Sequence, residues 1–123
     1  MKQTNLQDMT VGQLVNRFTA IGLDQDKALL RNEHAKFNRL YDEMDAIENE
    51  LKGRNGDQRR VLLDLYHHLN AQVRLNAIKA TLAVAPAPAR QMLEAMAGSR
   101  EYPQAGDAGM TLDNLDAGIF KPT

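Results

Sequence analysis

The sequence predicts an all-α fold of five to seven helices packed antiparallel. Apolar residues recur at intervals of three and four along most of the chain, which is the spacing of a helix with one buried face. Valine and isoleucine, which favour strands, are few. Short segments rich in glycine, proline and asparagine separate the periodic stretches, and loops this short connect antiparallel neighbours.

Residues 10–52 are expected to form a helical hairpin. Thr10 and Gln13 have the spacing of a capping box. The first helix is expected to continue through Gly22 to about residue 30, because glycine costs only about 1 kcal/mol inside a helix. Asn32 is expected to cap the second helix, which ends at the turn KGRNGD. The apolar faces of the hairpin are Val11, Leu14, Val15, Phe18 and Ile21, then Phe37, Leu40, Met44, Ile47 and Leu51.

The second half is expected to hold two more helix pairs, residues 57–85 and 86–118, and a tail over 119–123. Asp57 and Asn70 have the side chains of helix N-caps for the first pair. Prolines separate the pairs and can open the following helix. The apolar tail is expected to fold back over the last helix. The whole chain of 123 residues is expected to be one domain.

The stretch 71–84 is apolar nearly all round. One side carries valine and alanine, and another carries leucine and isoleucine. Such a helix is sandwiched between neighbours, and its alanines allow close approach. A stacked array of helices, in which each unit packs only on the next, has this requirement. The apolar positions are Val73, Ala77, Ala80, Thr81 and Val84, with Leu75, Ile78 and Leu82.

The pattern Val73, Arg74, Ala77, Ala80 resembles the second helix of a HEAT or armadillo repeat. An echo follows 31 residues later, at Ala108, Leu112 and Leu115. The resemblance implies a short right-handed α-α superhelix with compact HEAT/ARM-like repeats. It also implies that Arg74 holds an acidic residue of a neighbouring helix. The candidate partners are Asp64, Asp107 and Asp113.

The whole chain also resembles a small bacterial family known as a domain of unknown function. The resemblance is carried by the segments FNRLYDEM, ELKGRNGDQRR, NAQVRLNAIKATLAVAP and PQAGDAGMTL. It implies a small HEAT-like bundle and brings no substrate, cofactor or assigned site with it.

The histidines do not predict a metal site. His67 and His68 are adjacent, so on a helix they point about 100° apart and cannot chelate one ion together. Asp64 and His68 share a face, but a third ligand is not visible. The pair is expected to lie at a helix end, where positive charge complements the dipole.

Charges of opposite sign separate along residues 42–60. Five acids and no base occupy 42–50, and the turn that follows is rich in cations. Such segregation can steer a charged protein partner. The predicted interaction surface is Asp42, Glu43, Asp45, Glu48, Glu50, Arg54, Arg59 and Arg60.

Composition narrows the function classes. A net charge of −1 gives no overall positive field, so nucleic-acid binding needs a local patch. The absence of cysteine excludes disulfides and thiolate chemistry. No run approaches about 18 consecutive apolar residues, and the first residues lack the apolar core of a signal peptide, so a cytoplasmic protein without a membrane span is expected.

No nucleophile–base pair, phosphate-binding loop or metal triad is apparent, so an enzyme is not expected and no catalytic, cofactor or metal residue is predicted. The leading hypothesis is a protein-interaction module, such as an adaptor or a toxin-immunity-type inhibitor. A homodimer through Ile119 and Phe120 stays open. The scarcity of aromatics argues against a pigment-lyase-like role. The alternative is nucleic-acid binding through a basic face, with candidates Arg54, Arg59, Arg60, Arg74, Lys79 and Arg90.

Overall fold

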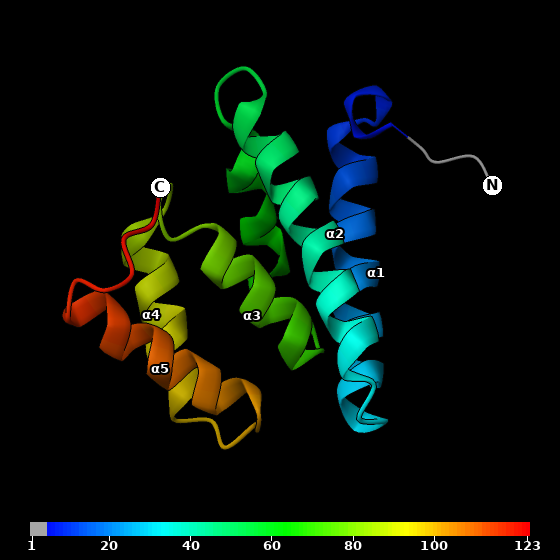
Figure 1. Cartoon of the computed structure of the whole chain (residues 1–123). Coiled ribbons are helices and arrows are strands. Elements are labelled where there is room, and N and C mark those ends of the chain that lie inside the picture. Colours follow the sequence, from blue (N-terminus) through cyan, green and yellow to red (C-terminus); the bar gives the residue numbers. More distant parts are fainter. Residues whose placement is uncertain (1–4) are drawn as a thin grey trace. The chain divides into compact units, whose positions relative to one another are not determined.

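The computed structural model describes residues 5–123, and all regular elements of this range are helices (Figure 1). The predicted all-α class is confirmed. The chain divides into two compact units, one up to Val61 and one from Leu62. The elements are η1 (Leu6–Asp8), α1 (Val11–Leu30), α2 (His34–Gly53), η2 (Gln58–His67), α3 (Ala71–Ala80), α4 (Pro86–Ala97) and α5 (Gln104–Asp116), where η marks a 3-10 helix.

The first unit is built on the hairpin of α1 and α2 (Figure 1). The predicted capping box is present, because the Thr10 hydroxyl accepts from the Gln13 amide at 3.1 Å and the Gln13 side chain accepts from the Thr10 amide at 2.8 Å. α1 continues through Gly22, as expected. The buried side chains of the two helices include Leu14, Phe18, Ile21, Leu40, Met44, Ile47 and Leu51.

Asn32 does not cap α2, contrary to the sequence prediction. It adopts a φ of 56°, in the left-handed region that asparagine tolerates better than most residues. Its amide donates to the Leu29 carbonyl at 3.2 Å, and the Glu33 amide donates to the Ala28 carbonyl at 2.8 Å. Asn32 therefore closes the end of α1, and α2 begins without a side-chain cap.

The segment after Asp57 is a 3-10 helix of 10 residues, where an α-helix was expected. Three of its buried residues, Arg59, Leu62 and Leu65, recur every third position, which is the period of a 3-10 helix, and Tyr66 is buried beside Leu65. Asp57 has a φ of 49°, and its carboxylate accepts from the Arg59 amide at 3.2 Å. Leu69 is 96% exposed, because the 3-10 helix has ended at His67.

The second unit contains α3, α4 and α5. Asn70 caps α3 as predicted, since its side chain accepts from the amides of Gln72 and Val73 at 2.9 and 3.1 Å. Most of α3 is buried, in agreement with its apolar circumference. It ends at Ala80, where the expected helix ran to residue 84, and the Thr81 hydroxyl donates to carbonyls of its last turn.

α4 begins at a proline, as predicted, and α4 and α5 pack against each other. Ala105 and Ala108 are buried. The tail folds back on the end of α5 through its backbone, since the amides of Ile119 and Phe120 donate to the Asn114 carbonyl at 2.9 and 3.1 Å. The Ile119 side chain is 76% exposed and that of Phe120 is 37% exposed, so their side chains cover the helix only in part. Among the described residues, no helix is both long and apolar enough to cross a bilayer.

Candidate functional site

The acidic residues predicted as an interaction surface are partly engaged within the first unit. Glu43 forms an ion pair with Arg17 at 2.8 Å, and Glu50 forms one with Arg54 at 2.9 Å. Asp42 and Asp45 are exposed on α2. The structure therefore leaves a smaller acidic surface than the count of carboxylates indicated.

The two central arginines of that predicted surface hold the fold together. Arg54 donates through Nη2 to the carbonyls of Leu6 and Met9, at 3.0 and 2.6 Å, and so ties η1 to the end of α2. Arg59 is only 5% exposed and is held by the Asp57 carboxylate through Nε at 2.9 Å and Nη2 at 2.7 Å. This hydrogen bonding lowers the pKa of Asp57 and raises the pKa of Arg59.

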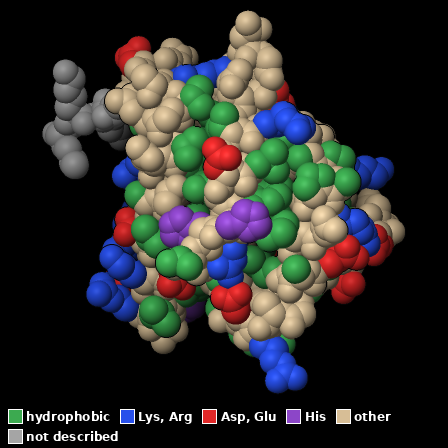
Figure 2. All heavy atoms as spheres, turned by 180° about the vertical axis from the view of Figure 1, so that it is seen from behind, with side chains coloured by type: hydrophobic (Ala, Val, Ile, Leu, Met, Phe, Trp, Pro, Cys, Tyr) green, Lys and Arg blue, Asp and Glu red, His purple; other side chains and the backbone are tan. Residues whose placement is uncertain are grey.

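The cations considered for nucleic-acid binding are also largely paired. In the second unit, Arg74 pairs with Glu101, Lys79 with Asp107, and Arg90 with Asp116. The hydrogen bonds of the last pair raise the pKa of Arg90 and lower the pKa of Asp116. Arg54 and Arg59, in the first unit, lie in ion pairs as well. On the face shown in Figure 2, acidic and basic side chains are interspersed, so neither sign dominates it.

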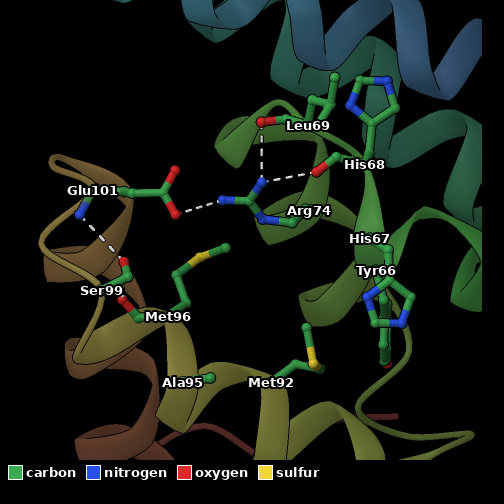
Figure 3. Close-up of a pocket in the computed structure, with 10 residues that line it drawn as sticks. All are labelled: Tyr66, His67, His68, Leu69, Arg74, Met92, Ala95, Met96, Ser99 and Glu101. Carbon is green, nitrogen blue, oxygen red and sulfur yellow. Dashed lines mark hydrogen bonds and ion pairs between the residues drawn. The ribbon is translucent and has the colours of Figure 1, made fainter.

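A pocket of about 440 Å³ in the second unit brings together residues that the sequence did not predict to share a site. Four segments contribute to it: the end of η2 with the residues after it, α3, α4 and the loop after α4 (Figure 3). Its lining residues are Tyr66, His67, His68, Leu69, Arg74, Met92, Ala95, Met96, Ser99 and Glu101.

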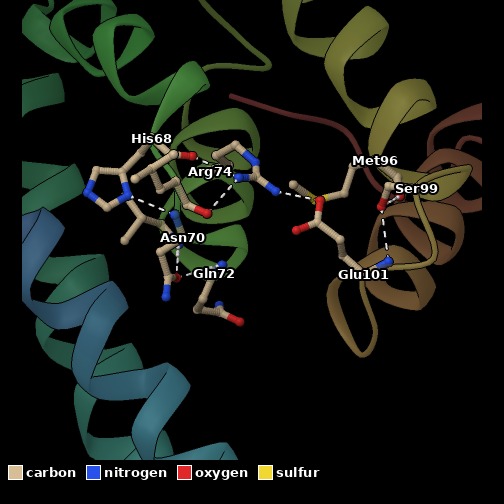
Figure 4. Close-up of polar contacts among 9 residues, drawn as sticks. His68, Asn70, Gln72, Arg74, Met96, Ser99 and Glu101 are labelled. Atoms are coloured by element: carbon tan, nitrogen blue, oxygen red, sulfur yellow. Dashed lines mark hydrogen bonds and ion pairs between the residues drawn. The ribbon is translucent and has the colours of Figure 1, made fainter.

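Arg74 is the central polar group of this pocket. Its Nη1 donates to the carbonyls of His68 and Leu69, at 2.8 and 3.0 Å, and its Nη2 donates to the Glu101 carboxylate at 2.6 Å (Figures 3 and 4). The side chain of Arg74 is 16% exposed and that of Glu101 is 48% exposed. Two backbone carbonyls therefore fix one side of the guanidinium, and the more accessible Glu101 carboxylate lies on its other side.

The backbone that receives Arg74 is itself held in place. The Asn70 amide donates to Nδ1 of His68 at 3.0 Å, next to the carbonyls that Arg74 contacts (Figure 4). On the same segment, the hydroxyl of Tyr66 is hydrogen-bonded to the hydroxyl of Thr81. These contacts fix the positions of the His68 and Leu69 carbonyls, and hence of the guanidinium.

Glu101 lies on the loop between α4 and α5. The Ser99 hydroxyl donates to the Met96 carbonyl at 2.7 Å, and the Glu101 amide donates to the Ser99 hydroxyl at 3.2 Å. Arg74 does hold an acidic residue, but that residue lies on a loop and not on a neighbouring helix, and the three candidate partners were wrong. Asp107 is taken by Lys79 at 3.0 Å, and the loop brings Glu101 to Arg74 instead.

The histidines line the pocket separately. His67 is exposed, and Nδ1 of His68 accepts a backbone hydrogen bond. Within residues 5–123, no group of three His, Cys, Asp or Glu side chains is placed to hold a metal ion. Leu69 is a large apolar residue between the 3-10 helix and the cap of the next helix, where it does not reach the core. Helical periodicity carried no signal of this, because it does not distinguish a 3-10 helix from an α-helix.

Comparison with known proteins gives a family and one structural relative. The model of the family described as "Domain of unknown function (DUF2019)" matches residues 12–116. The chain is similar to the crystal structure of the protein RPA1889 from Rhodopseudomonas palustris CGA009, with 53% identity, a TM-score of 0.94, and coverage of 98% of this chain and 100% of that one. No curated protein matches. The predicted likeness to a bacterial family of unknown function is confirmed.

Proposed function

Since the chain belongs to the family described as a domain of unknown function (DUF2019), which brings no activity with it, we propose a function from its own pocket. The chain is a non-catalytic, cytoplasmic module that binds a protein partner, acting as an adaptor or as an inhibitor of the toxin-immunity type. The observation that carries this proposal is an almost fully exposed leucine at a pocket walled by two methionines.

The pocket lining supports protein binding. Leu69 exposes nearly its whole side chain to water. Exposure of apolar surface to water is unfavourable, and contact with a partner would bury this surface. Met92 and Met96 have flexible, polarisable side chains, which adapt to the shape of a bound apolar group. Arg74 also fits a protein interface, because arginine is enriched at the centres of interfaces whereas the other charged residues are depleted there.

The polar groups of the pocket are occupied in ways that support a non-catalytic role. The Tyr66 hydroxyl is bonded to Thr81, and the Ser99 hydroxyl donates to a backbone carbonyl. Nδ1 of His68 accepts from the Asn70 amide. A nucleophile needs a base within hydrogen-bond reach, and the hydrogen bonds described for the pocket-lining serine do not join it to either histidine.

We also propose that residues 57–85 and 86–118 are HEAT/ARM-like pairs of a short right-handed superhelix. Support comes from α3, whose residues are buried around most of its circumference, as the middle helix of a stack requires. The 3-10 form of η2 departs from an ordinary repeat. Superposition of the two pairs in an experimental structure tests this: a common rotation and translation supports stacking, and unrelated crossing angles contradict it.

The binding proposal is tested by capture from an extract of the source cells. The immobilised protein is compared with Leu69→Asp, which places a charge at the pocket, and with Ala87→Asp, a matched change at an exposed position in the first turn of α4. We expect one protein to be retained stoichiometrically by the wild type and by Ala87→Asp. Its recovery should fall at least tenfold with Leu69→Asp, as measured by quantitative mass spectrometry.

A further arm uses Glu48→Lys, which reverses a charge on the acidic segment of α2. Loss of the partner with Glu48→Lys and retention with Leu69→Asp would move the contact to the surface predicted from the sequence. Retention of no protein that depends on either position would contradict the binding role, and capture of nucleic acid alone would favour the alternative class.

A further inference from the structure

We infer that the pocket around Arg74 receives the C-terminus of a partner protein whose last side chain is large and apolar, and that Glu101 occupies the place of that terminal carboxylate in the free protein. The inference rests on the proposed protein-binding function and specifies the ligand of the same pocket. It follows from the geometry of one arginine, the accessibility of its carboxylate and the apolar wall beside it.

The first step is the donor set of Arg74. Its hydrogen bonds within residues 5–123 use Nη1 and Nη2, and none of them uses the Nε–H group. Glu101 is engaged through a single oxygen, Oε1. The Nε and Nη2 edge of a guanidinium matches both oxygens of a carboxylate, as the Arg59–Asp57 pair of this chain illustrates. Arg74 can therefore hold a carboxylate in two-pronged fashion, which it does not do with Glu101.

The second step is the ease with which Glu101 can be replaced. Arg74 keeps its position without Glu101, because two backbone carbonyls hold Nη1. The Glu101 side chain is 48% exposed, and an ion pair with so exposed a partner contributes little to stability. Displacement of Glu101 by an incoming carboxylate therefore costs little and leaves Arg74 in an ion pair. An uncharged ligand that displaced Glu101 would leave Arg74 without an anion.

The third step is the apolar wall. In Figure 3 the Met96 side chain lies near the guanidinium, and Met92, which also lines the pocket, lies farther away on α4. A chain terminus carries its carboxylate and its last side chain on the same carbon atom, so both groups reach neighbouring subsites. Capture of a terminal carboxylate is a recurrent mode of peptide recognition. Charge complementarity and the nearby methionines thus favour a free C-terminus over an internal segment.

N-acetyl-L-leucine is the smallest probe with this chemistry, and N-acetyl-L-leucinamide is its uncharged match. Binding is followed by ¹H–¹⁵N and methyl NMR on the full chain. The acid is expected to shift the Arg74 Nε–H signal and the Met92 and Met96 methyls, with a dissociation constant on the order of 1–10 mM for so small a ligand. The amide should bind at least tenfold more weakly. Equal binding of acid and amide, or no shift at about 50 mM acid, overturns the inference.

Variants separate the role of each group. Glu101→Gln should bind the acid about two- to fivefold more tightly, because it removes the competing carboxylate at the strength of an exposed ion pair. Arg74→Lys keeps the charge but loses the planar guanidinium that can hold both carboxylate oxygens, so this variant should bind the acid at least tenfold more weakly. Arg90→Gln removes an arginine of another ion pair in the same unit and should change nothing. Weaker binding by Glu101→Gln contradicts the inference.

Two further outcomes separate this inference from the function on which it rests. If Ac-Asp-Leu-NH₂ binds more tightly than N-acetyl-L-leucine, the pocket reads an internal acidic segment and the terminal assignment is wrong. If a partner is captured in a manner that depends on Leu69 but N-acetyl-L-leucine does not bind, the protein-binding function stands and the C-terminal ligand is rejected. Dispersed amide spectra show that each variant is folded.

Discussion

At the scale of single residues, the ion pair of Asp57 and Arg59 makes the stability of the fold depend on pH. Arg59 is buried and the pKa of Asp57 is lowered, mainly by its side-chain hydrogen bond to Arg59. A carboxyl whose pKa is lower in the folded state stabilises the fold above its ordinary pKa near 4, and this contribution is lost as the pH falls through the folded value. The pair therefore stabilises the fold at neutral pH, and this contribution is lost only in acid.

Asp57→Asn is expected to lower the free energy of unfolding by about 1–3 kcal/mol at pH 7, because the buried guanidinium loses its charged partner. The difference from the wild type should shrink as the pH falls below the ordinary pKa near 4 and towards the lower pKa of folded Asp57. Urea unfolding at pH 7, 5 and 3 measures it, with the exposed Asp42→Asn as the control. A difference that is as large at pH 3 as at pH 7 would refute this account of the pair.

The sequence predicts the role of a residue more reliably than it predicts the partner of that residue. The resemblance to a HEAT-type helix implied that Arg74 holds an acidic residue, and Arg74 does form an ion pair with one. Its partner could not be predicted, because Glu101 lies in a loop and helical periodicity carries no information about where a loop side chain reaches. Arg59 was expected at the surface since it is charged, but a local carboxylate allows it to be buried.

At the scale of elements, the helix start at Thr10 is the clearest case in which sequence and structure agree. Thr10→Ala removes one side of the capping box and should cost about 1 kcal/mol of unfolding free energy. Thr10→Ser keeps the hydroxyl and should cost much less. Chemical denaturation followed by circular dichroism distinguishes the two. Equal stability of Ala and Ser variants would mean that the cap contributes nothing to the fold.

α3 gives the corresponding prediction for packing. Ala77 is completely buried, so Ala77→Glu would place a carboxylate without a designed partner among apolar side chains, at a cost of several kcal/mol. The second unit should lose its dispersed amide signals and part of its helical dichroism. Ala83→Glu changes an exposed alanine just after the helix and serves as the control. A folded Ala77→Glu protein would contradict the buried position of α3.

The elements that were predicted incorrectly share a physical cause. Spacings of three belong to both α and 3-10 helices, so the pattern of Arg59, Leu62 and Leu65 could not identify the form of η2. Asparagine suits an N-cap and a left-handed residue equally, so Asn32 could be placed at the junction but not assigned to the correct helix. Helix existence was predictable, and the chemistry of the junctions was not.

At the scale of the whole molecule, a count of charges proved a poor guide to the candidate site. The sequence indicated a charged surface at 42–60, but several of its residues pair within the first unit. The pocket of the second unit could not be predicted, since its lining comes from segments up to 35 residues apart, from Tyr66 to Glu101, whose closeness depends on tertiary packing. Composition and periodicity predict the class of fold, while the site depends on which side chains the loops bring together.

The central claim, that the pocket of the second unit contacts a protein partner, is tested most directly by site-specific crosslinking. The chain has no cysteine, so Leu69→Cys and the control Ala87→Cys each carry a single photoreactive maleimide. After irradiation in an extract of the source cells, position 69 should crosslink to one protein, and the yield at position 87 should be at least tenfold lower. Equal yields at the two positions, or no protein crosslinked at position 69, would contradict the claim.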